Sequence, residues 1–295
     1  MRISITGSTG FVGQNIVSRL LSYFDILEIS RSSFKLEITD VIIHLAGKAH
    51  DLKKVSSPDD YYKVNTELTK EIFDDFLLSN AKVFITLSSV KAVADEVDGE
   101  LFEDTTPNPI THYGKSKLLA EQYIGSKPIP EGKRVYILRP CMIHGPGNKG
   151  NLNLLYSLVS NGVPWPLGLF KNSRSYLSID NLCFIMRELI EREDIPSGIY
   201  NVADDIPLST NEVINIIAES NGKKARVLNL NMNLIKAIAR VGDLIKFPLD
   251  SDRLQKLTGS YVVSNAKIKA ALRKPLPVSS KDGLIRTFKS FADNA

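Results

Sequence analysis

A short apolar strand that runs directly into a glycine-rich turn opens the chain and limits its fold more than any other feature. The first residues read MRISITGSTGFVG, with glycines at positions 7, 10 and 13. Gly7 allows a tight turn, Gly10 lets a pyrophosphate approach the backbone, and Gly13 lets the next helix pack closely on the strand. That helix, expected over 11–23, directs its N-terminal amides at the phosphates. A plain strand-to-helix turn is the alternative, but this position in the chain favours a dinucleotide site.

Apolar segments alternate with helical patterns through the first half of the chain. Further strands are expected at 26–29, 41–45, 82–87 and 134–138, and helices at 11–23, 59–79 and 112–127. This alternation predicts an α/β fold, a doubly wound parallel sheet of the Rossmann type with helices on both faces. We expect about seven strands, drawn from residues 1–147 and from a later strand at 199–202.

The pattern changes after residue 147, where glycine, asparagine and proline gather and helices then dominate. These helices are expected at 180–193, 209–221, 231–246 and 281–292. We therefore expect a cofactor-binding domain at 1–147, rejoined by 199–202, and a smaller, mostly helical substrate-binding lobe at 148–295. The active site is expected in the cleft between them, at the carboxyl ends of the strands.

The helix expected at 231–246 carries its apolar residues on one side. They are Met232, Ile235, Ile238, Ala239 and one of Leu244 and Ile245. Because the other side is not strongly basic, this pattern favours a stripe that faces the core over a helix that lies on a membrane. No apolar run reaches the roughly 18 residues of a membrane span, so no membrane partner is expected.

Composition and charge indicate an ordinary soluble protein. Of 295 residues, 43% are hydrophobic and 24% charged, and the net charge of +4 is spread among acidic residues. This balance argues against a nucleic-acid partner and suits an anionic small molecule. Cys141 and Cys183 are too few for a disulfide framework, and the spacing of His44 and His144 suits no metal. A strand that starts at Arg2 leaves no room for a signal peptide, which predicts a cytoplasmic protein.

A tyrosine and a lysine four residues apart form the second chemical pattern. On a helix, Tyr113 and Lys117 share a face. A nearby ammonium stabilises a phenolate, which we expect to lower the pKa of Tyr113 toward the range of an acid/base catalyst. Ser89 follows the strand at 82–87, where a hydroxyl donor to a substrate oxygen belongs. Ser88 is the alternative, because a slip of one residue would exchange the two serines.

Taken in chain order, these motifs resemble the extended short-chain dehydrogenase/reductase family, in its nucleotide-sugar epimerase, dehydratase and reductase branch, which includes proteins similar to UDP-glucose 4-epimerase. The resemblance covers nearly the whole chain and rests on TGSTGFVG, VIIHLAG at 41–47, YKVN at 62–65, FITLSS at 84–89, LRP at 138–140 and SRSYLSIDNL at 173–182. It implies that Ser89, Tyr113 and Lys117 are catalytic. It implies cofactor contacts from Gly7, Ser8, Thr9, Gly10, Phe11, Val12, Gly13, Arg31, Leu45, Ala46, Gly47, Asn65, Tyr113, Lys117 and Pro140.

The two residues that follow Ser89 reduce the number of reaction types to be considered. Dehydratases of this branch carry an acidic pair there, whereas this chain has Val90 and Lys91. Two redox activities at C4 of a sugar remain, a 4-epimerase of a UDP-hexose or UDP-N-acetylhexosamine and an NADPH-dependent reductase of a 4-keto-6-deoxy nucleotide sugar. A non-catalytic dinucleotide sensor is the alternative of another class. Since Tyr113 and Lys117 are both present, catalysis is favoured.

The end of the second strand bears on the choice between NAD and NADP. Ser30 stands where a carboxylate would bind the ribose hydroxyls of NAD, and Arg31 follows it. An arginine suits the 2′-phosphate, so the sequence favours NADP, although Glu28 keeps NAD open. The short stretch from 33 to 40 leaves little room for the family's usual strand and helix.

Substrate contacts are expected from basic and amide groups in the second lobe. The resemblance implies that Arg174 holds a nucleoside diphosphate, which a guanidinium suits by bidentate contact. Asn151 and Leu152 begin a helix that offers further contacts, Arg253 is a second phosphate candidate, and Ser89 and Lys91 complete the set.

A homodimer is also expected, because the family pairs the helices at 59–79 and 112–127 into a four-helix bundle. The apolar residues proposed for that interface are Tyr61, Ile72, Phe73 and Phe76.

Overall fold

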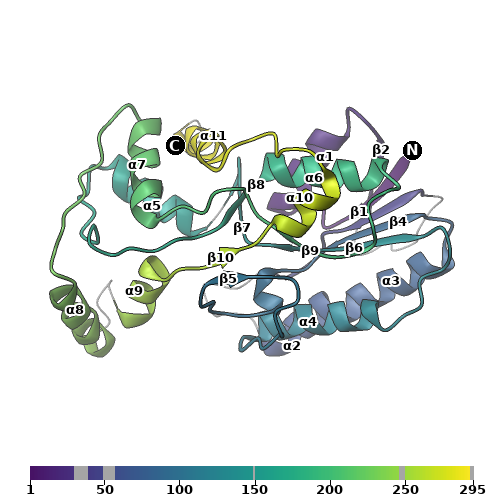
Figure 1. The fold of residues 1–295 in the computed structure, drawn as a ribbon, viewed down its shortest axis with the longest axis horizontal. Helices are drawn as coiled ribbons and strands as arrows, with labels where there is room; N and C mark the ends of the chain where they lie inside the picture. The colour runs from purple at the N-terminus through teal and green to yellow at the C-terminus, as the bar shows by residue number, and fades with distance from the viewer. Residues whose placement is uncertain (30–38, 49–56, 149, 246–249, 293–295) are drawn as a thin grey trace.

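A parallel six-stranded sheet forms the centre of the protein in a computed structural model that describes residues 1–29, 39–48, 57–148, 150–245 and 250–292. Its strand order is β2-β1-β3-β4-β6-β9, which confirms the doubly wound sheet (Figure 1). The strands are β1 (Arg2–Thr6), β2 (Asp25–Ile29), β3 (Val41–His44), β4 (Val83–Leu87), β6 (Arg134–Pro140) and β9 (Gly198–Val202). The described residues thus supply six of the about seven strands expected.

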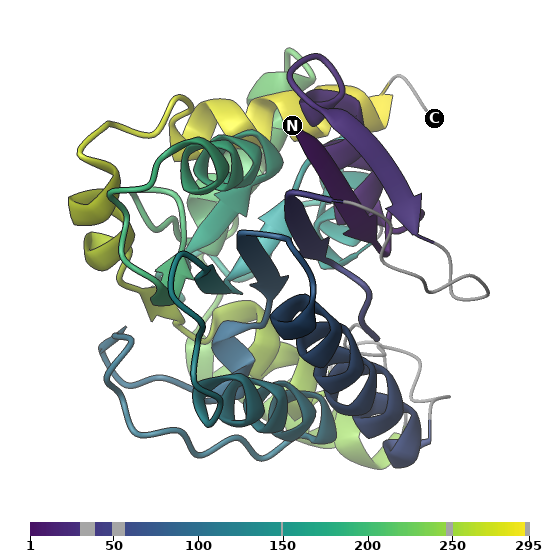
Figure 2. The same ribbon diagram turned by 90° about the vertical axis from the view of Figure 1, so that its right-hand side faces the viewer.

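Helices cover both faces of this sheet, as Figures 1 and 2 show. One face carries α2 (Pro58–Tyr61), a π-helix (Tyr62–Glu67), α3 (Leu68–Leu78) and α4 (His112–Gly125), and the other carries α1 (Phe11–Leu20), α6 (Ile179–Glu191) and α10 (Ala266–Leu272). Successive strand residues point to opposite faces. Ile42 and Phe84 pack against α3, whereas their neighbours Ile43 and Ile85 pack on the side of α1 and α6.

The remaining helices form a second core beside the sheet. They are α5 (Asn151–Ser160), α7 (Thr210–Ser220), α8 (Met232–Ile245), α9 (Ser251–Thr258) and α11 (Ser280–Ala292). Two short parallel pairs join the lobes: β7 (Met142–His144) with β8 (Tyr176–Ser178), and β5 (Glu100–Leu101) with β10 (Val262–Val263). A 3-10 turn (Val90–Ala92) follows β4. The boundary near residue 147 stays a prediction, since α6 and α10 come after it and still pack on the sheet.

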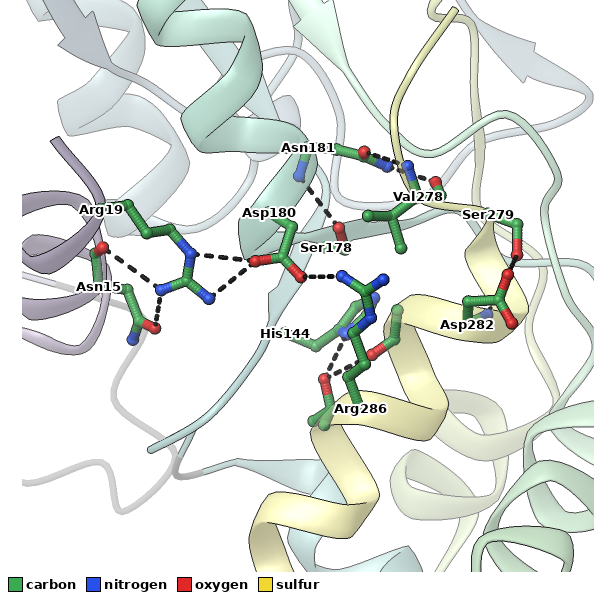
Figure 3. Close-up of polar contacts among 12 residues, drawn as sticks. Asn15, Arg19, His144, Ser178, Asp180, Asn181, Val278, Ser279, Asp282 and Arg286 are labelled. Atoms are coloured by element: carbon green, nitrogen blue, oxygen red, sulfur yellow. Dashed lines mark hydrogen bonds and ion pairs between the residues drawn. The ribbon is translucent and has the colours of Figure 1, made fainter. Parts of the chain in front are cut away.

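A half-buried acid ties the glycine-turn helix to the C-terminal lobe. Asp180 at the start of α6 accepts hydrogen bonds from Arg19 of α1 at 2.8 and 3.0 Å and from Arg286 of α11 at 3.1 Å (Figure 3). Next to it, Asn181 donates to the carbonyl of Val278 at 2.8 Å. These contacts hold α1, and with it the glycine turn, in a fixed position relative to the second lobe.

Of two expectations about apolar faces, the one for α8 is wrong in part and the one for the dimer interface is wrong. Of the residues expected in the α8 stripe, Ile235 and Ala239 are buried, at 3% and 1% exposed, whereas Met232, Ile238 and Leu244 are 42%, 37% and 84% exposed. The described chain covers only the side of this helix that carries Ile235 and Ala239, so the part of the stripe that faces the core is narrower than expected. The four residues proposed for a dimer interface, Tyr61, Ile72, Phe73 and Phe76, are all buried inside their own chain. Those on α3 pack against the sheet, which leaves them no surface to offer.

None of the helices in the described part of the chain is long and apolar enough to cross a bilayer. In the same part, no three His, Cys, Asp or Glu side chains gather in a way that could hold a metal ion. His44 is buried between Thr6 and Thr69, which lie 2.7 and 2.9 Å from its ring nitrogens. His144 is buried as well, with the Thr287 hydroxyl 2.8 Å from Nδ1.

Candidate active site

Of the three glycines in the turn, Gly10 is the one with open space beside its Cα. Gly7 has a φ of 73°, and a Cβ there would lie 2.5 Å from the Ala46 nitrogen; at Gly13 a Cβ would lie 2.2 Å from the Gly7 oxygen. The chain itself therefore requires these two glycines. At Gly10 a Cβ would meet only the Gly7 oxygen, at 3.4 Å, among the described atoms, and no described side chain caps α1. Open space in front of uncapped amides fits the phosphates of a dinucleotide.

The residues after β3 bring the turn close to α4. A Cβ on Gly47 would lie 3.2 Å from both the Asn65 Oδ1 and the Lys117 Nζ. Asn65, on the π-helix, accepts from the Lys48 backbone N–H at 2.8 Å and donates to the Ser116 hydroxyl at 3.0 Å. The predicted cofactor residues Leu45, Ala46, Gly47 and Asn65 thus meet Lys117 in one place.

Helix α4 is positioned by its first turn. Thr111 caps it by accepting from the Gly114 N–H at 3.1 Å, and a Cβ on Gly114 would lie 2.3 Å from the Lys91 carbonyl oxygen. This close packing brings Tyr113 to the serine at the start of the 3-10 turn. Further along, the Lys117 ammonium donates to the Leu87 carbonyl at 2.8 Å. Burial lowers its pKa to about 8, against the opposing effect of Glu121.

Tyr113 and Ser89 are hydrogen-bonded to each other, which places the phenol next to the predicted serine. Burial nevertheless raises the pKa of Tyr113, and the Ser89 hydrogen bond offsets this rise only in part. The expectation that Lys117 lowers the pKa of Tyr113 is therefore wrong. The physical reason is that the phenol is desolvated while the lysine points to Leu87.

The two adjacent serines face different surroundings. Ser88 donates to the Glu121 carboxylate, which also forms a buried ion pair with Arg139 at 2.6 Å, both side chains being 3% exposed. Ser89 accepts from the Lys91 backbone N–H at 3.2 Å and lines a cavity. Ser89 is thus the hydroxyl available to a ligand, and the alternative register at Ser88 is not supported by this geometry.

A cavity of about 240 Å³ opens beside Ser89. Its lining includes Ser89, Lys91, Pro140, Met142, Arg174 and Tyr261. Lys91 and Arg174 are cations, and no carboxylate is among the described lining residues. The Lys91 ammonium lies 4.4 Å from the Tyr261 ring centre, and Arg174 donates through Nε to the Gly259 carbonyl at 2.8 Å. Burial lowers the pKa of both groups, so an anion that enters this space meets poorly hydrated positive charge.

Other predicted contacts lie elsewhere. Arg253 on α9 is exposed, lies 3.5 Å from Asp250 and does not line the cavity. Asn151 is exposed at the start of α5, and Leu152 is 2% exposed in the second core. Arg31 lies outside the described residues. Pro140, which was predicted to contact the cofactor, lines the cavity beside Ser89.

Sequence reasoning missed two groups. Tyr261 forms one wall of the cavity and donates its hydroxyl to the Ala94 carbonyl at 2.7 Å, and no local pattern marks it. Glu121 and Arg139 form the buried pair behind Lys117. A signal for this pair was present, because Glu121 follows Lys117 by four residues and so lies on the same side of α4.

Comparison with known proteins agrees with this geometry. Residues 23–203 match the model of the family described as "NAD dependent epimerase/dehydratase family". The chain belongs to this family. It is therefore a member of a family of enzymes whose cofactor is a nicotinamide dinucleotide.

Individual relatives span almost the whole chain. The chain is 29% identical to "UDP-glucose 4-epimerase" of Vibrio cholerae, over 98% of this chain and 95% of that protein. It is 26% identical to "N-acetyl-alpha-D-glucosaminyl-diphospho-ditrans,octacis-undecaprenol 4-epimerase" of Escherichia coli O157:H7, over 90% and 84%. Among solved structures, UDP-glucuronic acid 4-epimerase from Bacillus cereus in complex with NAD has the same fold, with a TM-score of 0.77, 18% identity and coverage of 100% and 99%.

Proposed function

We propose that this enzyme is an NAD(P)-dependent 4-epimerase of a UDP-hexose or UDP-N-acetylhexosamine. One observation carries the proposal: the hydrogen-bonded pair Ser89 and Tyr113 adjoins a cavity that contains two cations and no described carboxylate. The pair suits proton transfer at a sugar hydroxyl, and the cations suit a diphosphate. The Vibrio and Escherichia relatives, both named as 4-epimerases, support the same reaction.

The protein groups have separate tasks in this reaction. Tyr113 takes the proton from the C4 hydroxyl during oxidation and, after the keto sugar has rotated to present its opposite face, returns the proton to the C4 oxygen as C4 is reduced. Ser89 would donate its one hydroxyl hydrogen to the same oxygen, while one of its lone pairs accepts from the Lys91 N–H. The dinucleotide supplies hydride acceptance and donation when bound. A raised pKa keeps Tyr113 protonated at rest, so the bound ligands must lower it for proton removal.

The cofactor would lie between the glycine turn and α4. Gly10 offers room for its phosphates, while Gly47, Asn65 and Lys117 surround the region expected to hold its nicotinamide ribose. Lys117, with a pKa of about 8, is still mostly charged at pH 7 and can donate to ribose hydroxyls. Arg31 keeps NADP as the favoured form in this proposal.

Lys91 and Arg174 would hold the diphosphate of the substrate. A diphosphate is shared by nucleotide sugars and by the lipid-linked sugar in the name of the Escherichia relative, so these cations do not by themselves distinguish the carrier. We favour the nucleoside diphosphate. We also propose that the enzyme acts in the cytoplasm as a homodimer, with sedimentation at micromolar concentration as the test of its assembly.

The decisive experiment identifies both cofactor and reaction. In the first part, the purified protein is denatured and any released dinucleotide is identified. In the second part, native protein is incubated with UDP-glucose, UDP-N-acetylglucosamine and a UDP-4-keto-6-deoxyhexose, with and without NADPH. Interconversion of C4 epimers is the expected result. Consumption of NADPH only with the keto sugar would instead show a reductase, and no turnover of any of them would exclude both activities for these substrates.

A matched pair of arginine variants tests the diphosphate contact. Arg174→Met should raise the KM for the active nucleotide sugar by about tenfold or more, because a charge-assisted contact is lost. Arg253→Met, which removes the second arginine that the sequence predicts as a substrate contact, should leave the KM within about twofold, because its exposed side chain lies outside the cavity. Equal effects would contradict the assignment of Arg174.

A further inference from the structure

The two cations of the cavity come from separate parts of the fold. Lys91 belongs to the 3-10 turn after β4, and Arg174 precedes β8. Burial is the main cause that lowers the pKa of Lys91; Asp95 opposes it, and the Arg174 charge lowers it again. The two cations thus repel each other, and no carboxylate is among the described residues that line the cavity. Another group must therefore hold them beside the same space.

The backbone of Tyr261 holds the segment that carries Arg174. The Tyr261 N–H donates to the Ser173 carbonyl at 2.8 Å, and the Tyr261 carbonyl accepts from the Ser175 N–H at 2.9 Å. Arg174 lies between these two bonds, and its Nε donates to the Gly259 carbonyl, two residues before Tyr261, at 2.8 Å. Strand β10 follows directly and pairs with β5 (Figure 1). Arg174 is therefore fixed relative to the backbone of Tyr261.

The side chain of Tyr261 reaches the other cation. Its ring centre lies 4.4 Å from the Lys91 Nζ, within the roughly 6 Å over which the face of a ring attracts an ammonium. Its hydroxyl donates to the Ala94 carbonyl at 2.7 Å, on the segment that follows the Lys91 turn. The Lys91 ammonium also donates to the Asp95 carbonyl. Since an ammonium has three hydrogens, Lys91 is held in place and can still donate to a ligand.

We propose that Tyr261 is a positioning residue whose backbone fixes Arg174 and whose ring holds the Lys91 ammonium, so that both cations meet the diphosphate of one substrate molecule. This inference rests on the proposed function in one respect, namely that the cavity takes a diphosphate. Without the ring, Lys91 keeps its charge but loses a contact that orders its long side chain. The ligand must then order that side chain itself, which weakens binding.

Calorimetric titration of the purified full-length protein with UDP and with UMP tests this role. Tyr261→Leu removes the ring and should raise the Kd for UDP by about tenfold. The Kd for UMP should rise by less than about threefold, because a single phosphate does not need both cations. Tyr261→Phe keeps the ring and should bind UDP within about threefold of the unaltered protein. In a Lys91→Met background, Tyr261→Leu should weaken UDP binding by less than about threefold further, because the ammonium that the ring holds is gone.

The matched control removes a ring from a lysine outside the cavity. Tyr123 on α4 has its ring centre 4.6 Å from the Lys127 Nζ and does not line the cavity, so Tyr123→Leu should leave the Kd for UDP within about twofold. Thermal unfolding shows whether each variant is folded, and Tyr261→Met replaces Tyr261→Leu if the latter is not. An equal loss in Tyr261→Phe, an equal loss for UMP, or the same tenfold loss in the Lys91→Met background would each overturn the positioning role.

These titrations also separate the positioning role from the proposed reaction. If UDP binding depends on the Tyr261 ring while no C4 epimers interconvert, the positioning role stands and the proposed reaction fails. If UDP binds the unaltered protein and Tyr261→Leu equally well, only the positioning role is overturned. If the unaltered protein does not bind UDP, inorganic pyrophosphate replaces it as the probe with the same variants. Failure of both probes to bind would overturn the positioning role together with the diphosphate assignment.

Discussion

Helices α4 and α8 have the same length, 14 residues each, and opposite relations between sequence and burial. In α4 the polar residues Ser116, Lys117 and Glu121 are buried. In α8 most of the large apolar residues are exposed. The comparison shows that polarity along a helix does not by itself say which side is covered.

The two helices differ in whether their buried polar or exposed apolar side chains have partners within the described chain. On α4 every buried polar group has a partner: Ser116 donates to the Tyr113 carbonyl, Lys117 to the Leu87 carbonyl, and Glu121 pairs with Arg139. Burying charge is unfavourable unless it is paired, so this arrangement persists because it serves the site. On α8 the exposed apolar groups bury little surface against the described chain, so they contribute little to folding.

The largest effect expected on α4 comes from breaking its buried ion pair. Glu121→Gln leaves the Arg139 charge buried without a counter-charge, and we expect the free energy of unfolding to fall by about 3–5 kcal/mol. Urea denaturation measures this loss. Glu121→Gln/Arg139→Met removes both charges and should recover much of the stability; a double variant as unstable as the single one would show that the unpaired charge is not the cause.

The second effect concerns catalysis rather than stability. Tyr113→Phe removes the phenol hydroxyl, and we expect turnover to fall by ~10²-fold or more with dinucleotide binding nearly unchanged. Steady-state rates and dinucleotide titration check the two parts. Tyr62→Phe is the control, because that hydroxyl contacts His112 at the exposed end of α4. Full activity in Tyr113→Phe would remove the tyrosine from the mechanism.

The sequence predicted those parts of the fold that depend on local pattern. The strand expected at 82–87 and the helix expected at 112–127 appear within about two residues of their expected bounds. A short continuous apolar run predicts a strand that is buried on both faces, and β4 is such a strand. Tyr113 and Lys117 were found in the same way, through their spacing on one helix. Their meeting with Ser89 followed from the rule that strand ends face the crevice.

What the sequence did not predict depends on distant neighbours. Tyr261 reaches the cavity only because β10 pairs with β5, some 160 residues earlier in the chain. The choice between Ser88 and Ser89 depends on Glu121, which occupies the first of them. The apolar stripe of α8 was visible, but no pattern within a helix tells whether another element covers it.

An effect of intermediate size is expected from lowering the pH, which acts on the stability of the protein through His44, a buried residue near Lys117 of α4. Burial, and next the Lys117 charge, lower the pKa of His44 from 6.5 to about 3. The unfolded chain therefore binds a proton between these values while the folded protein does not, so the free energy of unfolding falls as the pH drops from 6.5 toward 3. At pH 5 the loss is about 2 kcal/mol.

Denaturation at pH 7 and pH 5 checks this component. His44→Gln should lose less stability between the two pH values than the unaltered protein, by about that amount. His112→Gln, at an exposed histidine on α4, should leave the difference unchanged. An unchanged acid response in His44→Gln would mean that His44 is protonated in the folded protein.

The smallest effect is expected on the outer side of α8. Leu234→Gln should change the free energy of unfolding by less than about 0.5 kcal/mol, because a side chain that is 55% exposed loses little by becoming polar. The adjacent Ile235, 3% exposed, is the internal standard, and Ile235→Ala should cost about 2–4 kcal/mol through the cavity it leaves. Urea denaturation without lipid measures both. If Leu234→Gln were as destabilising as Ile235→Ala, the outer face of α8 would be part of the folded core after all.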